Sequence, residues 1–350
     1  MWDVVGEDER PEAVQMLQTR SSARQPLSWP SPELQEVLPI AWVHFPKCGT
    51  SFFNTIAHSP GVCPFLPEDA RLTSNTSEFR TTYLTSSIAC PGLATHNFNH
   101  PALGTASQPP YEQGKGHYMA MVRQPEQRIL SVYSDMRRCS PDTPGKCKID
   151  IRANKETSWG GWDSLELPNV TTFAKRQAGC MVRMLTRPGF PCGGLSDLAV
   201  SPEEVAEARR RLREGFSFVG ITDYWDLSIC LYSAMFKVGC RRIQFQDVRP
   251  GPDKWNNSWT DVPREMDADD ERRLNSTPLD ESVLNGFTDI FDGELYAEAL
   301  DIFEGRLKRY NVTKASCEPC WRDAGVLVDT SSVQKLLALG RSVQLVLGGA

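Results

Sequence analysis

The sequence predicts an α/β fold in which helices cover both faces of a central parallel sheet, within a single domain that carries loop insertions. Three short apolar segments, at residues 38–45, 117–122 and 216–221, have the length and composition of buried parallel strands. Each is followed by a segment of helical character, and strands that alternate with helices are typical of a parallel sheet. With 350 residues, 40% of them hydrophobic, the chain can bury one full core.

The first strand marks the beginning of the domain, which we place at residues 37–312. Residues 1–36 are polar and rich in proline near their end, so we expect a poorly ordered leader or stalk there. After the strand at 38–45, the chain turns at a glycine and continues as a short helix at 52–57. Residues 313–350 are assigned to a C-terminal tail.

The second strand, at 117–122, leads into a helix that begins at Pro125. Proline suits the first turn of a helix, and apolar residues then recur at helical spacing. Residues 59–116 and 140–162 show few periodic elements. We expect substrate-side loops in the first segment and an excursion from the fold in the second.

The third strand, at 216–221, follows a helix with a well-formed start. Ser201 is the predicted N-cap, Pro202 occupies the first helical position and Glu204 completes a capping box, while Gly215 ends the helix. Further helices are predicted at 173–186, 224–238 and 293–310.

The turn after the first strand, residues 45–52 (FPKCGTSF), fits a phosphate group. A strand that ends in a glycine turn and enters a helix directs several backbone N–H groups to one point, and the helix N-terminus adds partial positive charge. The hydroxyl groups of Thr50 and Ser51 are further donors. Because Lys47 precedes Gly49, the turn lacks the G-x-x-x-x-G-K-[ST] order of NTPases, which argues against an ATPase, GTPase or P-loop kinase. The alternative is an ordinary strand-to-helix turn.

A second anion-binding segment follows the second strand. Arg123 stands at the end of that strand and offers a planar, permanently charged fork to a phosphate, and Ser131 follows on the helix. Two anion-binding elements at the C-terminal ends of two parallel strands suit a ligand with two separated phosphates.

The two motifs together resemble those of the PAPS-dependent sulfotransferase superfamily, where PAPS is 3′-phosphoadenosine-5′-phosphosulfate. The likeness is to its Golgi carbohydrate branch, the uronyl 2-O-sulfotransferases among them. The family patterns are P-K-x-[GA]-[GST]-[ST] and R-x-P-x-x-R-x-x-S-x-Y, and this chain matches the second at Arg123, Pro125, Arg128, Ser131 and Tyr133. Residues 218–223 resemble the family's V-G-x-T-E segment, with Asp223 in place of glutamate. The resemblance covers scattered blocks of residues 38–240 and implies a P-loop-type sheet.

The resemblance also implies which residues bind the nucleotide. The 5′-phosphosulfate would be held by Lys47, Cys48, Gly49, Thr50, Ser51 and Phe52, and the 3′-phosphate by Arg123 and Ser131. Lys47 would also neutralise the bridging oxygen while the acceptor attacks sulfur in line. We expect no metal, because the transfer needs none and the sequence shows no acidic cluster that would bind one.

A general base must take the proton of the acceptor hydroxyl. Residues 94–100 (ATHNFNH) lie between the two motifs and resemble the G-H-x-x-F segment of the uronyl 2-O-sulfotransferases. This likeness implies His96 as the catalytic base, with His100 or a carboxylate as the alternative. His44 lies within a strand and His117 begins one, so we assign both to packing.

Charge, cysteines and sequons bear on partners and compartment. A formal net charge of −6 argues against a broadly basic nucleic-acid binder. Eleven cysteines, with the pairs Cys139/Cys147 and Cys317/Cys320 spaced for small disulfide loops, favour an oxidising compartment. Asn-x-Ser/Thr sequons, which mark glycoproteins, occur at Asn75, Asn169, Asn256, Asn275 and Asn311.

These features favour the secretory pathway, such as the Golgi lumen, with reduced thiols in a cytoplasmic protein as the alternative. A zinc site is disfavoured, because the chain has one C-x-x-C pair and no histidine cluster beside it. The N-terminus has no signal-peptide pattern and no apolar run is long enough to span a membrane. We therefore expect that a membrane-targeting segment is missing from this sequence.

The sequence thus predicts an enzyme that transfers a sulfuryl group from PAPS to a hydroxyl acceptor, with a carbohydrate as the expected acceptor. Two alternatives stay open. One is a cytosolic sulfotransferase for small phenols or alcohols, and the other is a non-catalytic module on the same fold that binds a nucleotide or a glycan.

Overall fold

A three-stranded parallel sheet lies at the centre of the fold, and its strands fall in the three predicted apolar segments. The computed structural model describes residues 29–68, 70, 72, 89–95, 100–139, 147–149, 169–189, 192, 199–246 and 279–326. Strands β1 (Ala41–Trp42), β2 (Tyr118–Val122) and β5 (Phe216–Ile221) lie side by side in the order β1-β2-β5, and both pairings are parallel. The described chain therefore combines helices with a small parallel sheet, as the α/β prediction requires.

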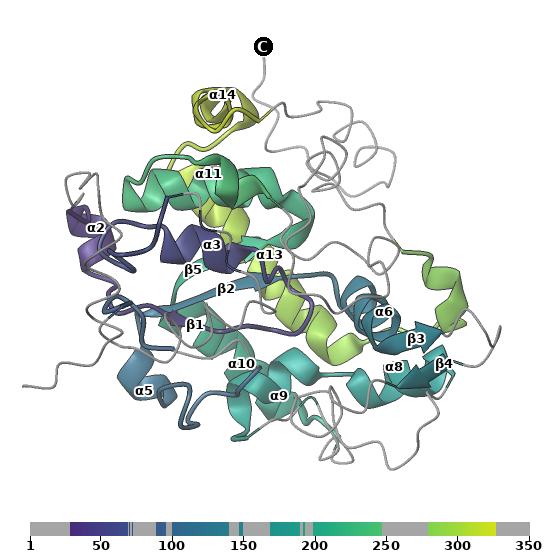
Figure 1. Cartoon of the computed structure of the whole chain (residues 1–350). Coiled ribbons are helices and arrows are strands. Elements are labelled where there is room, and N and C mark those ends of the chain that lie inside the picture. Colours follow the sequence, from purple (N-terminus) through teal and green to yellow (C-terminus); the bar gives the residue numbers. More distant parts are fainter. Residues whose placement is uncertain are drawn as a thin grey trace, which may run out of the picture.

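Helices cover both faces of this sheet (Figure 1). α3 (Phe52–Ala57) and α11 (Trp225–Phe236) lie on one face, and α9 (Cys180–Thr186) and α10 (Pro202–Gly215) lie on the other. The predicted capping box at the start of α10 is confirmed: Ser201 Oγ accepts the N–H of Glu204, and Glu204 Oε2 accepts the N–H of Ser201 at 3.0 Å. The long helix α13 (Ile290–Arg309) packs against β5 and α10.

Two predicted helices have different bounds in the structure. The helix expected at 173–186 is divided into α8 (Val170–Gln177) and α9, because Gly179 has a left-handed φ of 69°. A side chain at this glycine would come within 2.5 Å of Val200 Cγ2. The last predicted helix begins at Ile290 instead of residue 293, because the side chain of Asp289 accepts the N–H of Asp292 and caps it there.

The remaining described elements surround this layered core. They are α2 (Pro32–Gln35), α5 (Tyr111–Gly114), α6 (Pro125–Met136), α14 (Lys314–Asp323), the antiparallel pair β3 (Arg137–Cys139) and β4 (Cys147–Ile149), and the 3-10 helices η2 (Thr222–Tyr224), η3 (Arg242–Phe245) and η5 (Glu281–Leu284). Leu34 of α2 and Cys317 of α14 are fully buried in the main hydrophobic core. The packed structure therefore extends on both sides of the expected 37–312 domain.

Disulfide bonds are present, but one predicted pair is wrong. Cys317 and Cys320 do not bond to each other: Cys317 is joined to Cys230 of α11, and Cys320 to Cys240. The reason is that residues three apart on a helix share a face, and this face of α14 is turned toward α11 and the segment after it. The other two described bonds are Cys63–Cys90 and Cys180–Cys192. The predicted Cys139–Cys147 bond falls on side chains outside the described part of the chain.

The two bonds of α14 close loops of 87 and 80 residues. In the chain-entropy model, each bond over such a loop stabilises the folded state by about 4–5 kcal/mol. Disulfides of this kind are typical of proteins that fold in an oxidising compartment. Among the described helices, none is both long and apolar enough to cross a membrane.

Helices α6, α9 and α13 meet at a buried ion pair. Arg128 and Asp292 are both fully buried, and Arg128 Nη2 lies 3.4 Å from Asp292 Oδ2 and 3.0 Å from the carbonyl oxygen of Gln177. The Asp292 carboxylate also accepts the backbone N–H groups of Met181 and Val182 at 3.1 and 3.0 Å. One carboxylate of α13 therefore holds the first turn of α9 and the charged side chain of α6.

Asp289 belongs to the same cluster and is also buried. Both of its carboxylate oxygens lie 3.0 Å from the N–H of Gly179, which donates to them. Burial, reinforced by the negative charge of Asp292, raises the pKa of Asp289 to about 7.

This raised pKa predicts a specific pH dependence of stability. Between the ordinary value of 3.8 and about 7, the folded state binds a proton at Asp289 that the unfolded state does not. The free energy of unfolding should therefore fall as the pH rises through that window. In urea unfolding between pH 4.5 and 8, the free energy of unfolding of Asp289→Asn should fall less steeply with pH than that of the wild type, because the amide does not titrate.

Asp280→Asn is the matched control, since Asp280 is the exposed cap of η5 and its pKa is lowered by its bond to Ser282. This variant should keep the wild-type slope. A wild-type slope in Asp289→Asn would show that the carboxyl is ionised throughout this range.

Candidate functional site

Three segments that carry the predicted motifs lie at one edge of the sheet. Because β1, β2 and β5 are parallel, their C-terminal ends point the same way. Residues 45–51 follow β1, Arg123 directly follows β2, and Thr222 directly follows β5. Val122 and Ile221 are register partners, so Arg123 and Thr222 leave the sheet side by side.

The turn after β1 has an unusual backbone. Lys47 and Gly49 have left-handed φ values of 59° and 79°, and Lys47 is half-buried. The N–H of Cys48 donates to the carbonyl of Phe45 at 3.1 Å. Within the described residues, the backbone N–H groups of Gly49 and Thr50 donate to no protein acceptor. They are thus the donors of this turn that remain for an anion.

Gly49 is required by contact as well as by conformation. A Cβ atom at this position would lie 2.8 Å from Trp225 Cζ3 and 3.3 Å from Thr222 Cγ2. Trp225 is itself fixed, because its Nε1–H donates to the carbonyl of Gln244 at 3.0 Å. The start of α11 therefore determines how closely the turn approaches the end of β5.

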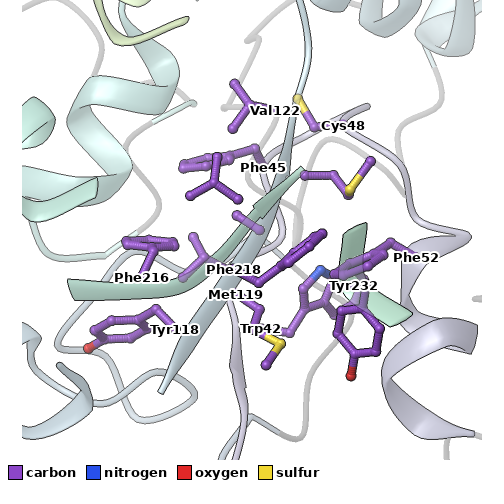
Figure 2. Close-up of a cluster of buried hydrophobic side chains, with 14 of the residues drawn as sticks. Trp42, Phe45, Cys48, Phe52, Tyr118, Met119, Val122, Phe216, Phe218 and Tyr232 are labelled. Carbon is purple, nitrogen blue, oxygen red and sulfur yellow. The ribbon is translucent and has the colours of Figure 1, made fainter. Parts of the chain in front are cut away.

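Two residues assigned to nucleotide binding point into the core (Figure 2). Cys48 and Phe52 are 1% and 0% exposed, and the Phe52 ring stacks on Phe218 with centroids 5.3 Å apart. Burial raises the pKa of the Cys48 thiol to about 12, even though Arg128 and Arg123 oppose the shift. Cys48 is therefore a neutral thiol rather than a nucleophile, and only the backbones of these two residues can face a ligand.

Arg123 is a cation without a fixed protein partner among the described residues. Its side chain is half-buried and forms no hydrogen bond or ion pair with them. Burial lowers the pKa of Arg123, and the nearby carboxylate of Asp223 opposes this shift. Asp223 in turn accepts a hydrogen bond from Tyr296 Oη at 3.3 Å. A partly desolvated guanidinium of this kind is well suited to an anionic ligand.

The other polar residues of the second motif have different surroundings. Arg128 is fully buried in the ion pair with Asp292, so its side chain does not face solvent. Ser131 lies on α6, about 9 Å along the helix axis from Pro125 at 1.5 Å per residue. It is half-buried, and its hydroxyl forms no hydrogen bond within the described part of the chain. Among the described residues no hydrogen bond joins Ser131 to Arg123, so the structure does not pair the two predicted 3′-phosphate ligands.

The predicted base, His96, lies outside the described residues, but its neighbours Thr95 and His100 are described. Thr95 Oγ1 donates to Gln108 Oε1 at 3.0 Å, and Gln108 Nε2 donates to the carbonyl of Trp42 at 2.6 Å. His100, the alternative base, is 6% exposed, and its ring contacts that of His44, which in turn contacts Thr50 of the turn.

His44 is a residue of this region that the sequence analysis assigned to packing. Its ring stacks on Trp42 with centroids 4.2 Å apart and contacts the ring of His100 at 4.4 Å. Its Nε2 also lies 3.1 Å from Thr50 Oγ1. The alternation of side chains along a strand could have indicated that His44 shares a face with Trp42, but the bond to Thr50 depends on how the turn folds back.

A separate cavity of about 620 Å³ adjoins η3. Its lining includes two cationic side chains, Arg241 and Arg242, and two acidic ones, Glu68 and Asp323. Arg241 Nη1 lies 3.3 Å from Glu68 Oε1. No sequence pattern indicates this cavity, because its walls come from three segments far apart in the chain.

The packing around Gly49 predicts the effect of a methyl group. Gly49→Ala should lower the free energy of unfolding by more than backbone strain alone, which costs about 1–2 kcal/mol at a left-handed φ. The added Cβ must also displace Trp225. Gly116→Ala is the matched control, since Gly116 has a φ of 88° and no atom within 4 Å of its virtual Cβ. Urea unfolding measures both variants. Equal losses of unfolding free energy would mean that displacing the Trp225 side chain has no energetic cost.

No protein-family model, no curated protein and no solved structure matches this chain.

Proposed function

We propose that the protein is a sulfotransferase that moves the sulfuryl group of PAPS to a hydroxyl group of a carbohydrate. One observation carries the proposal: motif segments far apart in the sequence end at the same edge of a parallel sheet. Ligands of open α/β sheets bind at the carboxyl ends of the strands. The likeness of the motifs to the sulfotransferase family and this common edge support the same kind of ligand.

The turn after β1 and Arg123 offer hydrogen-bond donors and positive charge to the two phosphate-bearing ends of PAPS. In the proposal, Lys47, the N–H groups of Gly49 and Thr50 and the Ser51 hydroxyl bind the 5′-phosphosulfate, and Arg123 binds the 3′-phosphate together with Ser131. Support comes from the N–H groups without protein acceptors and from the half-buried guanidinium without an ion-pair partner among the described residues.

The reaction is an in-line displacement at sulfur. The acceptor oxygen forms a bond to sulfur while the bond between sulfur and the bridging phosphate oxygen breaks, and adenosine 3′,5′-bisphosphate leaves. Lys47 stabilises the negative charge on that oxygen. The proton of the acceptor hydroxyl passes to His96, or to His100 in the alternative assignment. All protein groups in this step lie on or between the first two motifs.

The proposal also includes the cellular compartment of the protein. Four described disulfides support a lumenal or secreted protein, with the Golgi as the proposed location. Asn169 and Asn311, two of the sequon asparagines, are exposed. Exposure is what attachment of a glycan at these positions requires.

Nucleotide binding is the first test. Adenosine 3′,5′-bisphosphate should bind the wild type and raise its melting temperature. Arg123→Ala should weaken binding about ten- to hundredfold, because charge-assisted hydrogen bonds are worth about 1.5–3 kcal/mol. Isothermal calorimetry measures both.

Arg241→Ala is the matched control, since Arg241 lines the separate cavity. It should bind the bisphosphate as the wild type does. The cofactor assignment fails if the wild type shows no binding, and the site assignment fails if Arg241→Ala, instead of Arg123→Ala, loses it.

Transfer of labelled sulfate from PAPS, measured over glycan, tyrosine-peptide and phenol acceptors, tests the reaction. His96→Ala should retain bisphosphate binding and lose transfer by about a hundredfold or more, the usual contribution of a general base. His100→Ala takes this role if the alternative holds.

His117→Ala is the control, because His117 precedes β2 at the opposite end of the strand and its Nδ1 lies 3.0 Å from the carbonyl oxygen of Val37. It should transfer at the wild-type rate. Nucleotide binding without transfer to any acceptor would instead support the non-catalytic module.

A further inference from the structure

His44 is held in one orientation by its neighbours. It follows β1 and is 3% exposed, between the indole of Trp42 and the imidazole of His100. The planes of His44 and Trp42 differ by 18°. This stacking directs Nε2 toward Thr50, whose hydroxyl oxygen lies 3.1 Å away in a buried contact. The imidazole therefore has a fixed partner in the turn.

The direction of this hydrogen bond decides what Thr50 can offer a ligand. A hydroxyl has one proton to donate and two lone pairs that accept. If Thr50 donates to Nε2, its oxygen turns only lone pairs toward the turn and repels an anion. If Nε2–H donates to Thr50, the hydroxyl proton can donate to the anion. The backbone N–H groups of Gly49 and Thr50 can donate to it in the same way.

We propose that His44 is a positioning residue whose Nε2–H donates to Thr50 Oγ1, so that the Thr50 hydroxyl donates to the 5′-phosphate group of the nucleotide. This inference rests on the proposed function, because it concerns the same site. It adds a residue outside both sequence motifs. It also gives the buried His44–His100 stack a role, which is to keep the imidazole nitrogen aimed at Thr50.

A double-mutant cycle tests the inference. His44→Phe keeps an aromatic ring between Trp42 and His100 but removes Nε2, and Thr50→Val removes the hydroxyl with little change of shape. Each variant should weaken binding of adenosine 3′,5′-bisphosphate about tenfold, the range for a hydrogen bond to a charged group. The double variant should bind no more weakly than Thr50→Val, because His44 acts only through that hydroxyl.

Adenosine 3′-monophosphate, which lacks the 5′-phosphate, is the matched ligand. Its affinity should be the same in all four proteins. His44→Gln should restore most of the bisphosphate affinity, since its amide nitrogen can donate to Thr50. If the phenylalanine variant has a lowered melting temperature without ligand, His44→Leu, which also lacks a donor to Thr50, replaces it in the cycle.

The outcomes are distinct. Additive losses in the double variant, or equal weakening of the monophosphate, would assign His44 a merely structural role and overturn the inference. Unchanged bisphosphate affinity in His44→Phe would overturn it as well. A wild type that binds neither nucleotide would instead remove the proposed function, and the inference with it.

Discussion

The buried charge of Arg128 constrains the whole arrangement on one side of the sheet. A guanidinium with no exposed surface is costly unless a carboxylate and carbonyl groups surround it. Asp292 and the carbonyl of Gln177 supply two of these contacts, while Arg128 Nε and Nη1 have no hydrogen-bond partner among the described residues. Removal of Asp292 would leave a buried charge with one hydrogen bond among the described residues. The pair therefore fixes the position of α6 relative to α13. Arg123 lies two residues before the start of α6 at Pro125, so its place depends on the same pair.

The constraint extends to the turn after β1. Asp292 binds the N–H of Met181, and Met181 Sδ lies 4.0 Å from Cys48 Sγ. The Cys48 thiol is fully enclosed, between this methionine and the end of β2, where Arg123 lies. A side chain anchored so deeply turns the backbone of the turn outward on its other side. This explains how a neutral, buried cysteine can occupy a loop proposed to bind an anion.

Opposite Cys48, the turn is shaped by α11 and stabilised by α14. Trp225 leaves room only for glycine at position 49. α11 is joined to α14 through Cys230–Cys317, and the Trp321 indole of α14 donates to the carbonyl of Asp226 at 3.4 Å. The C-terminal region therefore reaches the turn through a covalent bond and one helix. Oxidative folding and the geometry of the proposed site are connected in this way.

The elements with local signals could be predicted from the amino-acid sequence alone. Apolar runs located the three strands, the Ser201 capping box located α10, and the glycine turn and Arg123 identified the two segments that meet at the sheet edge. These features can be recognised in the sequence because each depends on residues close together in the chain. The contacts between distant segments are evident only in the folded structure. It placed Cys317 opposite Cys230, Arg128 against Asp292 and His44 against Thr50, because such pairings depend on how helices and turns pack.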